Sequence, residues 1–466
     1  MKSLLAALLL GTPAAAIARP IDYRIDIGSA QARPVVTITL RFTGDADGGT
    51  DLDLPSEWAG SDTLWRNLNG WHVTGGTMAD TDRPERKHVR HKPGALITIR
   101  YRVTDPDPMP PGPEYLKALP WIERGWFSLH GEGVIVIPTG RDNAPARFRW
   151  GTVPRGWRVA SNLDMVPKLT ASQAAQSIFI GGRDLRLIER SVAGAPLRFA
   201  LLGRWGFTDA QLADHTQAVL QAENAMLGAA PIPFLVTLTP LTNPSGKRLS
   251  YGGTGRTAGF ALEGTANLPF SGLPRLLGHE YAHRWFFSPE ADDAARYWLT
   301  EGFNDWFSAQ AMLRTGDWDA ARWTKELNEV LKRHATSPAL ALTPQQRFDR
   351  FWTDQAAGQF PYDEGQLTAT IIDAQLRAAG QPGLLALLIQ VNRAGGLGDR
   401  PRMEATIERA LPGVLARTAA WLSRDGLAQL PADLLPCGTM AVTAGVPQFT
   451  LTEPACPALA GRVQHP

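Results

Sequence analysis

The sequence carries, at residues 276–285, the stretch Leu276-Leu277-Gly278-His279-Glu280-Tyr281-Ala282-His283-Arg284-Trp285. We expect a helix here, because Ser271 can cap it and Pro274 suits its first turn. On a helix, His279 and His283 are four residues apart, so both imidazoles project from one face and can reach one metal ion. Glu280 lies beside them, where it can act on a water molecule as a general base. The alternative is a pair of histidines on a helix face that bind nothing.

A second segment offers a third metal ligand. It has the sequence Trp298-Leu299-Thr300-Glu301-Gly302-Phe303 and is expected to begin another helix, with 17 residues between His283 and Glu301. Two histidines and one carboxylate leave one zinc position open, which is typical of catalytic rather than structural sites. Asp305 lies one turn after Glu301 and can accept the outer N–H of a ligand imidazole, which we expect to be His279. The alternative for Asp305 is a solvated or capping carboxylate.

A tyrosine in a third segment is a further candidate. The run Phe360-Pro361-Tyr362-Asp363-Glu364-Gly365-Gln366 is expected to open a helix that continues through Gln375. The phenol of Tyr362 can donate to the oxyanion that forms when water adds to a carbonyl group. Taken alone, a tyrosine at the start of a helix is usually a packing residue.

The rest of the chain predicts an α+β protein with more than one domain. Residues 19–192 contain short alternating runs such as 95–103, separated by turn residues, and these favour an all-β sandwich domain. Residues 193–426 predict a mixed α/β lobe, with a helix at 208–227 that Thr208 can cap, followed by an α-helical lobe. Residues 427–466 form a C-terminal tail that holds Cys437 and Cys456, either joined as a disulfide or as two free thiols.

Composition and the N-terminus restrict the class of protein. The 466 residues include 47 basic and 45 acidic side chains, for a net charge of +2, which argues against a nucleic-acid binder. Two cysteines exclude a cysteine-rich metal scaffold. Residues 1–18 have a basic start, an apolar run and an Ala-x-Ala end, which predicts a signal peptide; the alternative is a membrane anchor. We therefore expect export to the periplasm or the cell exterior, with no membrane attachment after cleavage.

The three motifs together resemble those of gluzincin metallopeptidases, the aminopeptidase N and glycyl aminopeptidase families. The family pattern is His-Glu-x-x-His, then Trp-Leu-x-Glu-Gly-Phe, then Tyr-x-Lys-Gly, and the run 154–161 is similar to the N-terminal domain of the glycyl aminopeptidase branch. The resemblance implies a thermolysin-like catalytic domain that hydrolyses peptide bonds. It also implies one Zn²⁺ per chain, held by His279, His283 and Glu301, with Glu280 and Tyr362 as catalytic residues.

The sequence departs from the family pattern at the substrate site. One residue fewer separates the second histidine from Glu301, and Glu364 stands where the family has lysine. In Tyr251-Gly252-Gly253-Thr254-Gly255-Arg256, Gly255 replaces the glutamate with which the relatives hold the free amine of their substrates. The expected activity is therefore either an aminopeptidase or an endopeptidase or other hydrolase on the same scaffold, with a catalytically silent peptide-binding protein as a further alternative. We expect an extended peptide substrate to pair with a strand formed by Gly259, Phe260, Ala261 and Leu262.

Overall fold

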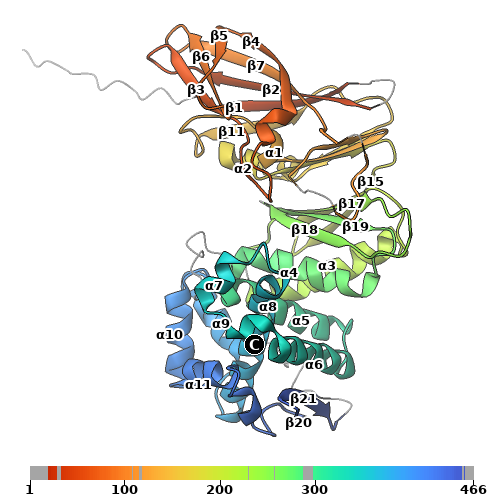
Figure 1. The fold of residues 1–466 in the computed structure, drawn as a ribbon, viewed down its shortest axis with the longest axis vertical. Helices are drawn as coiled ribbons and strands as arrows, with labels where there is room; N and C mark the ends of the chain where they lie inside the picture. The colour runs from red at the N-terminus through yellow and green to blue at the C-terminus, as the bar shows by residue number, and fades with distance from the viewer. Residues whose placement is uncertain are drawn as a thin grey trace, which may run out of the picture. The chain divides into compact units, whose positions relative to one another are not determined.

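The chain folds as two compact units, Met1–Leu185 and Arg186–Pro466, each with its own hydrophobic core (Figure 1). The structure is a computed structural model that describes residues 19–28, 33–107, 109–114, 118–228, 230–256, 258–286, 297–453 and 456. The expected signal peptide, residues 1–18, lies outside the described residues. The α+β class is confirmed, with a β-rich N-terminal part and a helical C-terminal part.

The described residues of the N-terminal unit form three sheets. Their strand orders are β13-β11-β1-β2-β7-β4, β10-β3-β6-β5 and β12-β14-β9-β8. The strands are β1 Ile21–Gly28, β2 Val35–Thr43, β3 Gly49–Asp53, β4 Leu68–Thr74, β5 Gly76–Asp80, β6 Arg86–His91, β7 Leu96–Val103, β8 Trp121–Glu123, β9 Trp126–His130, β10 Ile137–Pro138, β11 Pro145–Trp150, β12 Arg158–Ser161, β13 Leu169–Thr170 and β14 Ile178–Gly182. Two short helices accompany them, α1 Gly131–Val134 and α2 Ala171–Ala175.

The sequence alternation of the N-terminal strands decides which side chains enter its core. In β1 the side chains alternate, so that Ile25 is buried while Arg24 and Asp26 face outward. Ile25 shares one buried cluster with Val89 of β6 and Phe127 of β9, which belong to the other two sheets. The sheets therefore pack face to face on one apolar core, as a sandwich does.

The second unit joins a five-stranded sheet to a set of helices. The sheet order is β15-β16-β17-β19-β18, with β15 Arg186–Val192, β16 Ala195–Leu201, β17 Phe234–Leu241, β18 Tyr251–Arg256 and β19 Gly259–Thr265. The helices are α3 Asp209–Leu227, α4 Leu273–Phe286, α5 Tyr297–Thr315, α6 Ala320–Thr336, α7 Pro344–Asp349, α8 Gln355–Ala378, α9 Leu384–Arg393, α10 Arg400–Ala410 and α11 Val414–Trp421. Helix α4 contacts both β19 and α5, so it lies between the sheet and the helical lobe.

Several element boundaries differ from those expected. Thr208 does cap α3, since its hydroxyl accepts from the backbone of Gln211. In contrast, Ser271 does not cap α4, because it lies within a 3₁₀ turn that precedes the helix. Helix α8 begins at Gln355, where the Asp354 carboxylate accepts two backbone N–H groups, so Tyr362 lies inside the helix rather than at its start. Strand β15 joins the sheet of the second unit, whereas the sequence grouped residues 186–192 with the β domain.

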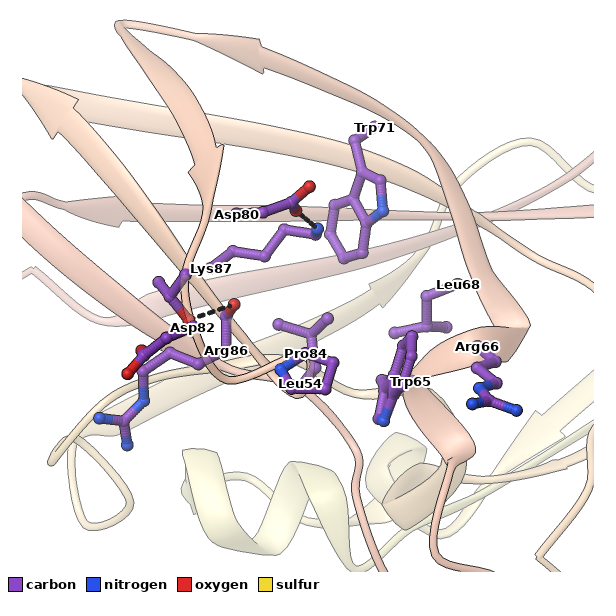
Figure 2. Close-up of a pocket in the computed structure, with 11 residues that line it drawn as sticks. Leu54, Trp65, Arg66, Leu68, Trp71, Asp80, Asp82, Pro84, Arg86 and Lys87 are labelled. Carbon is purple, nitrogen blue, oxygen red and sulfur yellow. Dashed lines mark hydrogen bonds and ion pairs between the residues drawn. The ribbon is translucent and has the colours of Figure 1, made fainter.

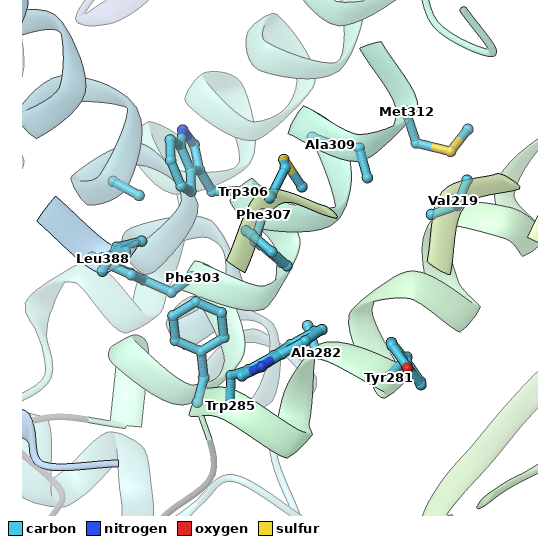
Figure 3. Close-up of a cluster of buried hydrophobic side chains, with 14 of the residues drawn as sticks. Val219, Tyr281, Ala282, Trp285, Phe303, Trp306, Phe307, Ala309, Met312 and Leu388 are labelled. Atoms are coloured by element: carbon cyan, nitrogen blue, oxygen red, sulfur yellow. The ribbon is translucent and has the colours of Figure 1, made fainter. Parts of the chain in front are cut away.

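Buried aromatic side chains hold α4 against α5. Figure 3 shows Trp285 of α4 close to Phe303 and Phe307 of α5. The ring centroids of Trp285 and Phe307 are 5.8 Å apart in an edge-to-face arrangement, which suits the charge distribution of two aromatic rings. Each fully buried side chain of this size contributes about 1.5–3 kcal/mol to folding. This packing fixes the rotation of α4 and therefore the direction in which its polar face points.

The described part of the C-terminal tail folds back onto α6. Strands β20 Gly438–Thr443 and β21 Val446–Leu451 form a hairpin, and Cys437 and Cys456 are joined by a disulfide. The side-chain amide of Asn328 in α6 donates to the Phe449 carbonyl at 2.9 Å and accepts from the Phe449 N–H at 2.8 Å. Among the described residues, no helix is long and apolar enough to cross a membrane.

Candidate metal centre

The two histidines of α4 lie side by side, one turn apart. Their ring centroids are 4.9 Å apart and the rings are nearly perpendicular. Helix α3 supports α4 closely at Gly278, because a Cβ atom there would lie 2.7 Å from a carboxylate oxygen of Glu223. Gly278 is therefore required for this approach of the two helices.

Glu301 of α5 completes a group of three metal ligands. Its Oε2 lies 3.2 Å from His279 Nε2 and 3.7 Å from His283 Nε2. One donor atom from each of the three residues lies within 4.8 Å of the others. Two imidazole nitrogens and one carboxylate oxygen are ligands that zinc accepts in catalytic sites. The donor set therefore fits a zinc ion.

Asp305 lies behind this group and orients His279. Its Oδ1 is 3.0 Å from His279 Nδ1, which leaves Nε2 to face Glu301. Arg275 lies 3.2 Å from the same Asp305 oxygen, and it also binds Glu326 and Gln366. Residues 275, 279 and 283 share one helix face at intervals of four, so the sequence carried a signal for Arg275 that our prediction did not use.

The charges of the group are set by burial and by neighbouring ions. Burial lowers the pKa of His283 to about 4, which keeps its lone pair available at neutral pH. Burial would also lower the pKa of His279, but its hydrogen bond to Asp305 outweighs this and raises the pKa well above the usual value. Burial would raise the pKa of Glu301, yet the two histidines and the Tyr362 phenol hold it below its usual value. The negative charge of the site lies on the carboxylates of Glu301 and Asp305, on either side of the His279 imidazole. A zinc ion would take the place of the proton on His279 Nε2.

Removal of the Asp305 carboxylate is expected to weaken zinc binding. Asp305→Ala should lower zinc affinity by about 10–100-fold, because the imidazole of His279 loses the acceptor that fixes its orientation. Competition with a fluorescent zinc chelator measures this affinity. Asp305→Asn keeps an acceptor oxygen and should recover most of the loss. Equal affinity in the wild type and Asp305→Ala would refute an orienting role.

Tyr362 reaches the group from α8. Its ring stacks on that of His279 with centroids 5.7 Å apart, and its phenol donates a hydrogen bond to Glu301. Helices α5 and α8 approach at two glycines, since a Cβ atom on Gly302 would lie 2.2 Å from the Cα atom of Gly365. Both glycines belong to the sequence motifs of these helices, but the contact between them was not predicted. Glu364, at the position of the family lysine, turns to Arg347 with an ion pair of 3.2 Å.

Glu280 faces the sheet at Gly255. A Cβ atom added to Gly255 would lie 3.4 Å from Glu280 Oε2, so β18 runs beside the metal ligands. Strand β18 ends the described sheet, and β19 is its one partner among the described strands.

The prediction that an extended substrate pairs with residues 259–262 is wrong. Gly259, Phe260, Ala261 and Leu262 belong to β19, which is hydrogen-bonded to β17 on one side and β18 on the other. All four residues are buried. A peptide cannot add to β19, because both of its edges are already paired. Among the described strands of this sheet, β15 and β18 lie at the edges, and β18 is the edge strand beside Glu280.

The N-terminal unit contains a separate cavity of about 590 Å³. Figure 2 shows Lys87 extending beside the ring of Trp71 to an ion pair with Asp80. The Lys87 ammonium lies 5.6 Å from the centre of that ring, and the Arg66 guanidinium lies 5.1 Å from the Trp65 ring. The faces of the Trp65 and Trp71 rings are therefore already occupied by cationic side chains of the protein. None of the three metal donors lines this cavity.

The fold is similar to those of solved metallopeptidase structures. An aminopeptidase N family protein from Idiomarina loihiensis matches with a TM-score of 0.65 and 17% identity, over 84% of this chain and 74% of that one. An M1 zinc metallopeptidase from Deinococcus radiodurans matches with a TM-score of 0.50 and 15% identity, over 87% of this chain and 94% of that one. No protein-family model and no curated protein matches the sequence. At these identities the likeness establishes the fold: the chain has the multi-domain architecture of these structures.

Proposed function

We propose that the chain is an exported zinc metallopeptidase that hydrolyses peptide bonds. The observation that carries this proposal is the buried donor group of His279, His283 and Glu301, with Asp305 behind it and Tyr362 stacked on it. The similarity to metallopeptidase folds supports it. Export rests on residues 1–18 of the sequence.

The mechanism assigns a separate task to each side chain. A zinc ion held by the three ligands supplies a Lewis acid that polarises a carbonyl group and acidifies water. Glu280 removes a proton from the attacking water and delivers it to the leaving amine, so that its own charge is restored at the end of the cycle. Tyr362 donates its phenol hydrogen to the oxyanion that develops on the former carbonyl oxygen. Asp305 holds His279 in place throughout.

We propose that the substrate backbone binds along β18. The outer edge of this strand is free of other described strands, and Gly255 lies beside Glu280. An extended peptide can add to such an edge through main-chain hydrogen bonds, which hold the scissile bond irrespective of side-chain type.

Gly255 favours an enzyme that does not require a free N-terminus on its substrate over an aminopeptidase. No carboxylate at position 255 is available to pair with a substrate ammonium group, and Arg256 adds a positive charge. The kcat/KM for N-acetylated peptides should therefore lie within about threefold of the kcat/KM for the same peptides with a free N-terminus. Gly255→Glu should shift the preference towards free amines by roughly tenfold, the worth of about 1.4 kcal/mol. Strict dependence of the wild type on a free amine would exclude the endopeptidase alternative.

A peptide-library digest followed by mass spectrometry tests the peptidase assignment. The zinc-loaded protein should release fragments, and a chelator should stop their release. Absence of turnover by a zinc-loaded protein that still binds the peptides would overturn the proposal and favour the silent binding protein. The positions of cleavage distinguish an aminopeptidase, which releases single N-terminal residues, from an endopeptidase, which cleaves internal bonds.

A further inference from the structure

The outer face of the six-stranded sheet in the N-terminal unit is rich in arginine. The outward-pointing cationic side chains come from three neighbouring strands and from β11, and they are Arg24, Arg41, Arg100, Arg102, Arg147 and Arg149. All but Arg24 are exposed. The acidic side chains on the same part of β1 are Asp22 and Asp26. The face is therefore strongly positive, although the whole chain carries a net charge of only +2.

The strand register arranges part of this face in a straight row. Arg149 of β11 lies opposite Arg24 of β1, Arg24 opposite Thr39 of β2, and Thr39 opposite Arg100 of β7. His72 of β4 continues the row beside Arg100. Since neighbouring strands lie about 4.8 Å apart, the row extends across roughly 19 Å at right angles to the strands. Such a row can contact several consecutive units of a linear molecule.

Most of these arginines have no partner of opposite charge. Among the described residues, Arg24 pairs with Asp26 at 2.6 Å, whereas Arg100, Arg102 and Arg149 make no ion pair. An arginine in an ion pair is partly neutralised, but an unpaired guanidinium keeps five N–H donors for an anion. The charge of this face is therefore available to a ligand.

A hollow with both polar and apolar side chains in its walls lies along the row. It has a volume of about 480 Å³. Its lining combines Arg24, Arg100, Arg102, Asp26, Thr37, Thr39 and Thr152 with Ile27, Gly28 and Val35. Threonine hydroxyls can accept or donate, and a carboxylate accepts hydrogen bonds from hydroxyl groups. The hollow thus offers cationic groups for acidic substituents and neutral or anionic acceptors for hydroxyl groups within one site.

We propose that this face binds an extended anionic polysaccharide. A sugar chain that carries carboxylate or sulfate groups supplies both the anions and the hydroxyl groups that the hollow can bind. A membrane surface fits less well, because it would attract the arginines by charge alone, whereas a sugar chain also brings hydroxyl groups to Thr37, Thr39 and Asp26 within the hollow. The proposal is independent of the metal centre and of the reaction proposed there.

Binding to defined polysaccharides tests the proposal with the full-length chain. Polygalacturonate and heparin serve as anionic probes and dextran as the uncharged control. The wild type should bind at least one anionic probe in low salt and not dextran. The variant Arg100→Gln, Arg102→Gln, Arg149→Gln should bind that probe at least tenfold more weakly. The matched variant Arg90→Gln, Arg155→Gln, Arg158→Gln removes the same charge from exposed positions outside the row, and it should stay within twofold of the wild type.

A third variant separates loss of charge from loss of folding. Replacing the same three row arginines by lysine keeps the charge and should retain binding within about fivefold, while thermal unfolding should be alike in all variants. Three results would each overturn the proposal. These are no binding to either anionic probe, equal losses in the two glutamine variants, and tighter arginine-dependent binding to phosphatidylglycerol vesicles than to the polysaccharides.

Discussion

Glu280→Gln is expected to lower kcat for peptide hydrolysis by roughly 10²–10⁴-fold, the usual contribution of a general base. Glutamine has nearly the shape of glutamate but cannot take a proton from water at neutral pH. Glu280 is not one of the three metal donors, so zinc should remain bound at one equivalent per chain. Steady-state kinetics on a cleaved peptide and elemental analysis of the purified variant measure the two quantities.

Two further variants make this result specific. Glu329→Gln removes a carboxylate from an exposed position of α6 and should leave kcat unchanged. His279→Ala removes a ligand and should lose both zinc and activity. Hydrolysis at the wild-type rate by Glu280→Gln would remove Glu280 from the mechanism, whatever the metal content of the variant.

Local spacing was sufficient to predict which side chains share a helix face, but not that the two helices meet. The interval of four residues between His279 and His283 places both rings on one helix face, wherever that helix lies in the fold. The same argument applies to Glu301 and Asp305 on α5. That α4 and α5 lie side by side does not follow from local spacing. This proximity was predicted from the resemblance of the second motif to the family pattern. The structure brings all four side chains together.

Strand order could not be predicted in the same way. The apolar run at 259–262 correctly indicates a strand, but sequence alone does not tell whether its edges are free. Strand β18, which precedes β19 in the chain, covers one edge, and β17 covers the other. The run is apolar because β19 is buried in the sheet, and that same burial removes it as a binding edge. The partly exposed, glycine-containing β18 was the better candidate.

The start of α8 was misplaced for a related reason. The sequence expectation placed the start of this helix within residues 360–366. The actual first turn lies at Gln355, where Asp354 caps it, and Pro361 is accommodated within the helix. Asp354 is an N-cap residue type, and that signal in the sequence was not used.

Gly302→Ala is expected to destabilise the second unit by about 1–3 kcal/mol, the usual effect of overpacking a core. A methyl group at position 302 would lie 2.2 Å from the Cα atom of Gly365 and 2.5 Å from the backbone nitrogen of Gln366. These are backbone atoms, so no side-chain rotation can relieve the clash and α5 must move away from α8. The clash outweighs the gain of about 1 kcal/mol that alanine brings to a helix interior.

Urea unfolding measures this loss, and Gly206→Ala is the matched control. A Cβ atom at position 206 would meet no atom within 4 Å, so the control should stay within about 0.5 kcal/mol of the wild type. The kcat per folded molecule should also fall in Gly302→Ala, beyond the loss of activity caused by unfolding. Glu301 precedes Gly302, and Tyr362 lies one turn before Gly365, so separation of the helices draws a zinc ligand away from the phenol. Wild-type stability in Gly302→Ala would contradict a close contact of α5 and α8 at Gly302 and Gly365. Normal kcat in a destabilised variant would mean that the contact serves folding alone.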